Sequence, residues 1–310
     1  MPDAPNEFGD ETQQRQRIVR GRLCVLAAAI MWSTSGFFAQ SPVFSDWPES
    51  ERGLLLAFWR ATFASSVLIP MTRRRSWSPL MPVMVVIFVL MNITFLTALV
   101  RTTSANAIWL QNTAPMWVFF VGVFGLGEVA RRADYWLIGC CAAGVGFILW
   151  YEMGGKSPVG VICGLLSGAT YAAVVLCLRQ LRGHDAAWLA VVNHVGTALA
   201  ISPLLLTTGV WPQGMQWVYL AAFGIFQMGL PYVLFALGLR SLSGHEASGI
   251  VLLEPLLVPL WVWIAYRQLP AWWTVVGGAF ILTGLLIRYV AVGAGSRAAR
   301  VVAAEPTHVQ

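Results

Sequence analysis

Residues 80–100 read LMPVMVVIFVLMNITFLTALV, which is 21 consecutive positions without a charged side chain. At about 1.5 Å of rise per residue, an α-helix of this length covers roughly 30 Å, the thickness of the hydrocarbon layer of a bilayer. The stretch therefore predicts a transmembrane helix.

Nine other stretches of similar length share this apolar character. Apolar residues make up 57% of the 310 positions and charged residues only 11%, with a mean hydropathy of +0.68, so no water-soluble domain is left over. The sequence predicts an all-α integral membrane protein whose ten transmembrane helices are Leu23–Gln40, Gly53–Met71, Leu80–Val100, Thr103–Val123, Tyr135–Tyr151, Val159–Leu178, Ala187–Thr207, Trp217–Leu239, Ala247–Tyr266 and Ala271–Tyr289.

The placement of basic residues predicts the orientation. If the amino terminus lies in the cytoplasm, fifteen basic residues fall on the cytoplasmic side and four on the outer side. The cytoplasmic set is Arg15, Arg17, Arg20, Arg22, Arg73, Arg74, Arg75, Arg131, Arg132, Arg179, Arg182, Arg240, Arg288, Arg297 and Arg300, and the outer set is Arg52, Arg101, Lys156 and Arg267. The positive-inside rule then places both termini in the cytoplasm. The net charge of +6 reflects this topology and attraction to anionic lipid, and nucleic-acid binding explains it poorly.

A cleaved signal peptide is an alternative interpretation of the first span. An Arg-rich segment precedes an apolar run that ends near Ala39. Cleavage would leave nine spans and put the arginine-rich loops on the outer side, so an uncleaved first helix is favoured.

The chain also repeats itself at an offset of about 140 residues. The corresponding pairs are Thr103–Ala107 with Ser243–Ala247, Ala114-Pro115 with Glu254-Pro255, Gly144 with Gly284 and, at an offset of 139, Trp32 with Tyr171 and Arg101 with Arg240. Two halves of five helices explain these matches. Because five is odd, the second half enters the membrane from the opposite face, which is the inverted-topology repeat of alternating-access carriers.

This repeat divides the chain into four parts. We expect a cytoplasmic N-terminal tail at 1–21, a first five-helix repeat at 22–152, a second at 159–290 and a cytoplasmic C-terminal tail at 291–310. The two tails are the clearly polar stretches of the chain and are expected to be disordered or to lie on the membrane surface.

Short motifs follow one another in a characteristic order. They are Trp32-Ser-Thr-Ser-Gly36, Trp59-Arg60-Ala-Thr-Phe-Ala64, Thr103-Ser-Ala-Asn-Ala107 leading to Thr113-Ala-Pro115, and Leu253-Glu-Pro255. In this order, and over about residues 22–289, the chain resembles the EamA-type branch of the drug/metabolite transporter superfamily. The resemblance implies a central substrate cavity lined mainly by helices 1, 3, 4, 6, 8 and 9, with helices 5 and 10 at the periphery, and transport of small metabolites, often outward.

Residues near the middle of the bilayer are the candidates for substrate binding. Counting the rise from the helix ends places Trp32, Tyr171 and Asn92 near the middle and Gln227 close to it. Aromatic and amide groups at this depth could stack on a ligand and form hydrogen bonds with it, although interfacial anchoring and ordinary interhelical hydrogen bonds compete with this interpretation. The full candidate set is Trp32, Asn92, Gln111, Tyr171, Gln227, Tyr232 and Glu254.

Three ionisable residues, Arg60, His194 and Glu254, lie inside the predicted spans. A charge at this depth costs roughly 2.5–3.5 kcal/mol on insertion scales, so each needs a partner, a wet cavity or neutralisation. Glu254 and His194 both lie about 11 Å from the inner face, and Arg60 about 11 Å from the outer face. We hypothesise that Glu254 and His194, paired or singly, exchange a proton during transport. The alternative is a permanently protonated Glu254 packed beside Pro255.

Proline and glycine mark places where helices bend or approach closely. Pro115, Pro231 and Pro255 each remove an intrahelical hydrogen bond, so they are candidates for hinges, or for simple kinks. A small-residue face on the sixth span consists of Gly160, Gly164 and Gly168. This face predicts close packing inside a monomer or, as a second interpretation, a weak homodimer.

Motifs of other protein classes are missing. There is no Walker loop, no dinucleotide glycine pattern, no His-Glu-x-x-His sequence and no metal-like cysteine spacing. We therefore expect no catalytic residue, no cofactor and no metal site, and we expect that the protein is not an enzyme.

The sequence favours a secondary transporter of the bacterial inner membrane that exports a small neutral or zwitterionic, amino-acid-like metabolite by alternating access, with possible proton coupling. A membrane-embedded enzyme or sensor, a channel, and an organophosphate or nucleotide-sugar antiporter remain alternatives. The last would require several Lys or Arg side chains in the cavity, where only Arg60 lies.

Overall fold

The computed structural model describes residues 7–125, 127–153 and 158–304, and side chains between residues 13 and 292. Within these ranges the protein is entirely helical. The α-helices are α1 (Glu7–Trp32), α2 (Ser35–Ala39), α3 (Glu49–Leu68), α4 (Leu80–Arg101), α5 (Ser104–Gln111), α6 (Ala114–Phe120), α7 (Arg132–Glu152), α8 (Pro158–Gln180), α9 (Ala186–Thr208), α10 (Met215–Gly224), α11 (Leu230–Gly238), α12 (Gly244–Val251), α13 (Glu254–Tyr266) and α14 (Trp272–Ala304). Short 3-10 turns lie at Pro42–Phe44 and Ile69–Met71, and π-helical turns at Val121–Gly125 and Ile225–Gly229.

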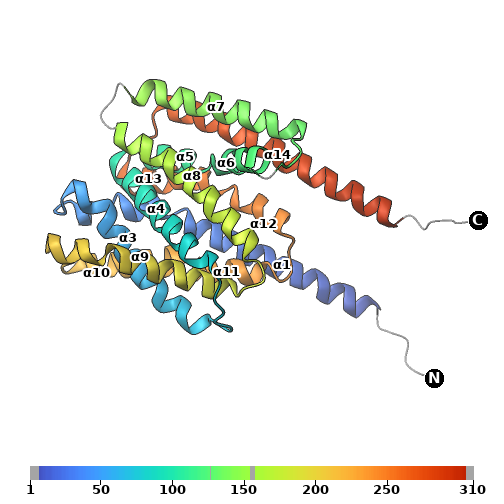
Figure 1. The fold of residues 1–310 in the computed structure, drawn as a ribbon, viewed down its shortest axis with the longest axis horizontal. Coiled ribbons are helices and arrows are strands. Elements are labelled where there is room, and N and C mark those ends of the chain that lie inside the picture. Colours follow the sequence, from blue (N-terminus) through green and yellow to red (C-terminus); the bar gives the residue numbers. More distant parts are fainter. Residues whose placement is uncertain (1–6, 126, 154–157, 305–310) are drawn as a thin grey trace, which may run out of the picture.

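These elements combine into ten helices that are long and apolar enough to cross a membrane, as the sequence predicts. Four of these spans are assembled from two helices each: α1 with α2, α5 with α6, α10 with α11, and α12 with α13. Both chain ends lie at the same end of the bundle (Figure 1). We call this end the terminal face, and the other end the opposite face. Lys156, one of the basic residues assigned to the outer side, lies outside the described residues.

The first span differs from its predicted bounds. Helix α1 begins at Glu7, well before Leu23, so part of the polar segment expected to be a disordered or surface-lying tail is helical instead. Gln, Glu and Arg are good helix formers, and extending an existing helix avoids the cost of nucleating a new one. The helix therefore continues past the end of the apolar stretch.

The helix pairs follow the internal repeat. Helix α4 packs against α8, and its repeat counterpart, the span containing α11, packs against α1. Helices α3 and α9, the second spans of the two repeats, pack against each other. The peripheral helices α7 and α14, the last spans of the repeats, run side by side along one edge of the bundle (Figure 1).

The α7 and α14 contact is itself symmetric under the repeat. A Cβ on Gly144 would lie 2.4 Å from the carbonyl oxygen of Gly277, and one on Gly284 would lie 3.2 Å from the carbonyl oxygen of Leu137. Adding 140 to Gly144 and Leu137 gives Gly284 and Gly277, so the same contact occurs twice with the partners exchanged. The inverted repeat is therefore present in the packing as well as in the sequence.

The glycine face of the sixth span packs inside the monomer. A Cβ on Gly164 would lie 2.9 Å from the side chain of Leu110, and one on Gly168 would lie 2.7 Å from the Leu110 carbonyl oxygen. Both contacts let α8 approach α5 directly. Close packing of the two helices accounts for this glycine pattern.

Asp185 joins the loop before α4 to the start of α9. Its carboxylate accepts hydrogen bonds from the backbone N–H groups of Arg73, Arg74, Ala187 and Trp188. Partial burial opposes ionisation, but these four N–H donors outweigh it and lower the pKa of Asp185 below its ordinary value. The charged carboxylate therefore caps α9 and holds the preceding loop.

Candidate functional site

Four spans are interrupted near their middle. Helix α1 stops at Trp32 and α2 resumes after Ser33 and Thr34, α5 and α6 are separated at Asn112 and Thr113, and α12 and α13 are separated at Leu252 and Leu253. In the eighth transmembrane span a π-helical turn, Ile225–Gly229, separates α10 from α11. These are helices 1, 4, 9 and 8, all of which the family resemblance assigned to the cavity. Irregular backbone at membrane depth is tolerated where it is buried in protein or lines a cavity.

The three candidate hinge prolines directly follow these interruptions. Pro115, Pro231 and Pro255 lie in the first turns of α6, α11 and α13. Proline fits there because the first-turn N–H of a helix has no intrahelical acceptor in any case. Their position is compatible with a hinge, and that role stays a prediction.

The interruption after α1 contains no proline and sequence reasoning missed it. The Ser33 hydroxyl donates to the carbonyl oxygen of Ile30, and the Thr34 hydroxyl donates to that of Met31, both at 2.6 Å. Such local bonds offer the backbone an alternative to the helical pattern. The Ser-Thr-Ser run after Trp32 was the available signal.

Aromatic side chains from three spans face the bundle interior near these interruptions. The rings of Trp32 and Tyr232 meet edge to face with centroids 5.6 Å apart, and both side chains are half-buried. Tyr171 is 42% exposed, yet it lies within electrostatic range of Tyr232 and Glu254, which belong to other spans.

Two further candidates lie at interruptions. Glu254, the first residue of α13, is half-buried, lies within electrostatic range of Tyr171 and Tyr232, and forms no ion pair among the described residues. Gln111, the last residue of α5, is also half-buried. Trp32, Gln111, Tyr171, Tyr232 and Glu254 thus all keep exposed surface.

Asn92 and Gln227 have a different environment, because protein groups already occupy their amide donors. The Asn92 amide nitrogen donates to the Phe88 carbonyl oxygen at 3.0 Å, while its oxygen accepts a hydrogen bond from Arg60. The Gln227 amide nitrogen donates to the Trp32 carbonyl oxygen at 3.0 Å. Both side chains are buried, so ordinary interhelical bonding describes their contacts in this conformation.

Arg60 is buried in the middle of this region, with 2% of its surface exposed. Besides its hydrogen bond to Asn92, its guanidinium carbon lies 5.2 Å from the centroid of the Phe223 ring, which is the geometry of a cation–π contact. It lies within electrostatic range of Tyr232 and His194. Sequence reasoning recognised the charge but did not include Arg60 among the binding candidates.

His194 is completely buried, and neither ring nitrogen has a hydrogen-bond partner. Its ring centroid lies 5.1 Å from that of Phe88 and 6.0 Å from that of Tyr232. The predicted pairing of His194 with Glu254 is therefore wrong for this conformation. Equal depth did not bring them together because α9 packs against α3 and α4, whereas α13 packs against α2 and α5.

The spans close tightly on the opposite face. The Phe37 ring stacks between the rings of Tyr266 and Tyr219, with centroids 5.7 and 6.3 Å apart, and the Tyr266 hydroxyl donates to the Phe37 carbonyl oxygen at 2.7 Å. The Trp261 indole N–H donates to the Ser33 hydroxyl at 2.8 Å. Helices α5 and α13 also pack against each other on this side.

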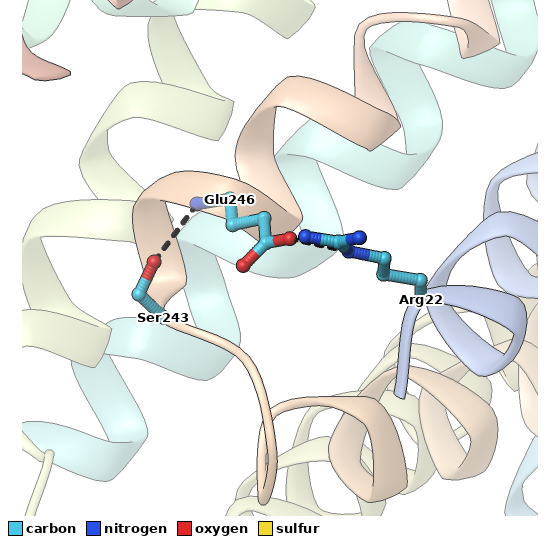
Figure 2. A network of polar contacts seen from close by, with 3 residues as sticks. All are labelled: Arg22, Ser243 and Glu246. Carbon is cyan, nitrogen blue, oxygen red and sulfur yellow. Dashed lines mark hydrogen bonds and ion pairs between the residues drawn. The ribbon is translucent and has the colours of Figure 1, made fainter. Parts of the chain in front are cut away.

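On the terminal face the corresponding halves, α6 and α12, are not among the helix pairs that pack closely over the described residues. Three ion pairs of the described residues join other neighbouring segments. Arg22 of α1 pairs with Glu246 of α12 at 2.7 Å, and the Ser243 hydroxyl caps the backbone N–H of Glu246 (Figure 2). Further pairs join Arg179 to Glu128 at 3.3 Å and Arg288 to Asp134 at 3.1 Å.

No group of three His, Cys, Asp or Glu side chains that could hold a metal ion occurs in the part of the chain that the structure describes. The five cysteines are free thiols. Among the described residues around these interruptions, the polar groups include hydroxyls, amides, the Glu254 carboxylate, the His194 imidazole and the Arg60 guanidinium.

Two inverted five-helix repeats with interrupted spans around a shared interior define a membrane transporter fold. The model of the EamA-like transporter family matches residues 19–150 and 158–290, and the chain belongs to this family. The resemblance found in the sequence motifs is thereby confirmed.

Relatives that match most of this chain are named as transporters. An uncharacterised transporter of Archaeoglobus fulgidus is 26% identical over 63% of this chain and 70% of its own length. The pseudopaline exporter CntI of Pseudomonas aeruginosa is 23% identical over 74% of this chain and 84% of its own length. A solved crystal structure that is 20% identical shares the fold, with a TM-score of 0.60 over 86% of this chain and 94% of that chain.

Proposed function

We propose that the protein is a secondary transporter of the inner membrane that exports a small neutral or zwitterionic metabolite by alternating access, with its terminal face in the cytoplasm. The observation that carries the proposal is an asymmetry between the two faces. The opposite-face halves α5 and α13 pack closely, whereas the repeat-related halves α6 and α12 on the terminal face are not among the closely packed pairs of the described residues.

Inverted repeats give such an asymmetry a direct meaning. If the two repeats exchange conformations, α6 and α12 come together and α5 and α13 separate, so the interior opens to the other side. The present conformation then corresponds to the state that opens toward the terminal face. The three interruptions and the π-helical turn lie where these half-helices would have to move independently.

The interior groups support the class of cargo. Aromatic faces at Trp32, Tyr171 and Tyr232 suit an apolar or aromatic portion, and the unpaired Glu254 carboxylate suits an amine. Gln111, at the break between α5 and α6, supplies an amide. Phosphorylated cargo would call for several cations, whereas Arg60 alone is buried near this region. The relative named as an exporter supports the outward direction.

A flux measurement tests the proposal. Inside-out membrane vesicles from cells with and without the gene are compared for uptake of labelled amino acids, and reporter fusions locate the two termini. We expect uptake into the vesicles and both termini in the cytoplasm. Termini on different sides would reject the inverted repeat, whereas uptake of phosphorylated compounds alone would favour an organophosphate or nucleotide-sugar antiporter. Chemical conversion of the substrate would favour an enzyme.

Proton coupling by Glu254 is a separate part of the proposal. A half-buried carboxyl without an ion-pair partner can bind and release a proton as its surroundings change. We expect Glu254→Gln to abolish the pH dependence of uptake, while Glu128→Gln, which changes a carboxylate on the terminal face, leaves it intact. An unchanged pH dependence in Glu254→Gln would reject coupling through this residue. His194→Gln tests the second proton-coupling candidate in the same assay.

A further inference from the structure

Arg60 carries a buried positive charge without a carboxylate partner. The three ion pairs of the described residues join other side chains, and Arg60 is in none of them. A guanidinium has five N–H donors, and Asn92 is the one hydrogen-bond acceptor that the described side chains supply to it. Its Nε–H is buried without an acceptor.

The groups beside Arg60 are also incompletely satisfied. Both ring nitrogens of the completely buried His194 lack a partner, and no acidic side chain compensates the nearby guanidinium. Burying an unpaired polar group has a free-energy cost, and burying an uncompensated charge has a larger one. An additional acceptor carrying a negative charge would remove both costs.

The cluster adjoins the transport interior through Tyr232. This half-buried side chain contacts both the His194 ring and the Trp32 ring, and it lies within electrostatic range of both Arg60 and Glu254. A ligand against Trp32 and Tyr232 would therefore lie near both a cation and a carboxylate.

The backbone holds the guanidinium in place. A Cβ on Gly224 would lie 2.3 Å from the Phe63 Cβ and 2.8 Å from the Arg60 carbonyl oxygen, so the span containing α10 lies directly against α3 here. This approach places the Phe223 ring over the guanidinium. Asn92 is oriented in turn by its bond to Phe88.

We propose that Arg60, with His194 and Tyr232 beside it, is a recognition site for a carboxylate group of the transported molecule. The inference rests on the proposed transport function and narrows its substrate class to carboxylate-bearing cargo, with Glu254 facing the positively charged end of a zwitterion. Arg60 supplies a fixed charge with free N–H donors, and His194 and Tyr232 supply further donors.

A matched pair of probes tests the site without measuring flux. Phenylacetate and phenylacetamide have nearly the same shape and differ in charge. We expect phenylacetate, and not the amide, to raise the thermal stability of the purified full-length protein. The stabilisation should be lost in Arg60→Met and retained in part in Arg60→Lys. Equal effects of the two probes, or an undiminished phenylacetate effect in Arg60→Met, would overturn the proposal.

A measurement on the unmodified protein covers the case in which Arg60 variants fail to fold. Phenylglyoxal modifies guanidinium groups, and peptide mass spectrometry reports its reaction at Arg60 and, as a control, at the exposed Arg22. We expect phenylacetate to slow modification of Arg60 at least threefold and to leave Arg22 unaffected. No protection of Arg60 would overturn the proposal. Protection together with absent flux would support the site and count against the transport function alone.

Discussion

Helices α7 and α14 are related by the same repeat as the spans α5–α6 and α12–α13, yet the two pairs meet differently. The first pair consists of continuous helices that form the same glycine contact twice, at Gly144 and at Gly284. The second pair is interrupted in both members, and over the described residues it packs closely on the opposite face but not on the terminal face. In the proposed alternating-access cycle, a contact that obeys the repeat symmetry stays unchanged when the repeats exchange conformations, whereas an asymmetric contact switches. We therefore interpret α7 and α14 as scaffold and the interrupted spans as moving parts.

The largest effect on stability is expected from a substitution that forces α7 and α14 apart. Gly144→Leu places a side chain where a Cβ already lies 2.4 Å from the Gly277 carbonyl oxygen, and we expect it to lower the free energy of unfolding by about 3 kcal/mol or more. Unfolding in mixed detergent micelles measures the effect. Gly146→Leu is the matched control, because nothing lies within 4 Å of its Cβ position. Equal stability of the two variants would contradict the scaffold assignment.

A second change removes a link between the scaffold and the moving parts. The Thr274 hydroxyl of α14 donates to the Asn106 side-chain oxygen of α5 at 2.7 Å, and both residues are fully buried. Thr274→Val leaves that oxygen without a donor, so we expect a loss of about 1–3 kcal/mol in the free energy of unfolding.

The control for this link is Thr283→Val on the same helix. Its hydroxyl is exposed and bonds only to its own helix, at Ala279, so the expected change is within about 0.5 kcal/mol. A loss at Thr283 as large as that at Thr274 would show that the helix, and not its link to α5, determines the effect.

A third substitution weakens the packing between spans on the opposite face. Tyr266→Phe removes the hydrogen bond to the Phe37 carbonyl oxygen but keeps the stacked ring, so the closed arrangement should lose about 1 kcal/mol. In a background without native cysteines, labelling of Thr34→Cys by an impermeant thiol reagent from the opposite face should accelerate about fivefold. Tyr219→Phe keeps that bond and should leave the rate unchanged. Slower or equal labelling in Tyr266→Phe would argue against a closed gate at this position.

The smallest stability change is expected at Asp185, which lies outside both helix pairs. The lowered pKa of Asp185 means that its charge stabilises the folded state above the ordinary carboxyl pKa near 3.8, and that this contribution is lost as the pH falls through the lower folded pKa. Asp185→Asn keeps a capping oxygen without charge, so we expect it to cost about 0.3–1 kcal/mol at pH 7. Thermal unfolding of the two proteins should converge below about pH 4, and a difference that persists at lower pH would point to the cap instead of the charge.

The candidate site was predictable in part. The interruptions after Asn112, in the π-helical turn and after Leu252 all precede a proline, so residue type marked them in advance, while the break at Ser33 had no such marker. Depth along the helix identified Trp32 and Tyr171, and the presence of an ionisable group inside a span identified Glu254. All three side chains keep exposed surface. The same criterion also selected Asn92 and Gln227, whose amide nitrogens donate to backbone carbonyl groups.

The sequence by itself determined the ten spans, the inverted repeat and the family, because the bilayer imposes a length and an apolar composition on every helix. Those are properties of single segments. The tertiary structure was needed to show that His194 forms no bond to Glu254, that Arg60 has Asn92 and Phe223 for neighbours, and that α5 and α13 pack together on the opposite face. The physical reason is that depth is set by position along a helix, whereas contact also depends on how each helix is rotated and which neighbours it packs against.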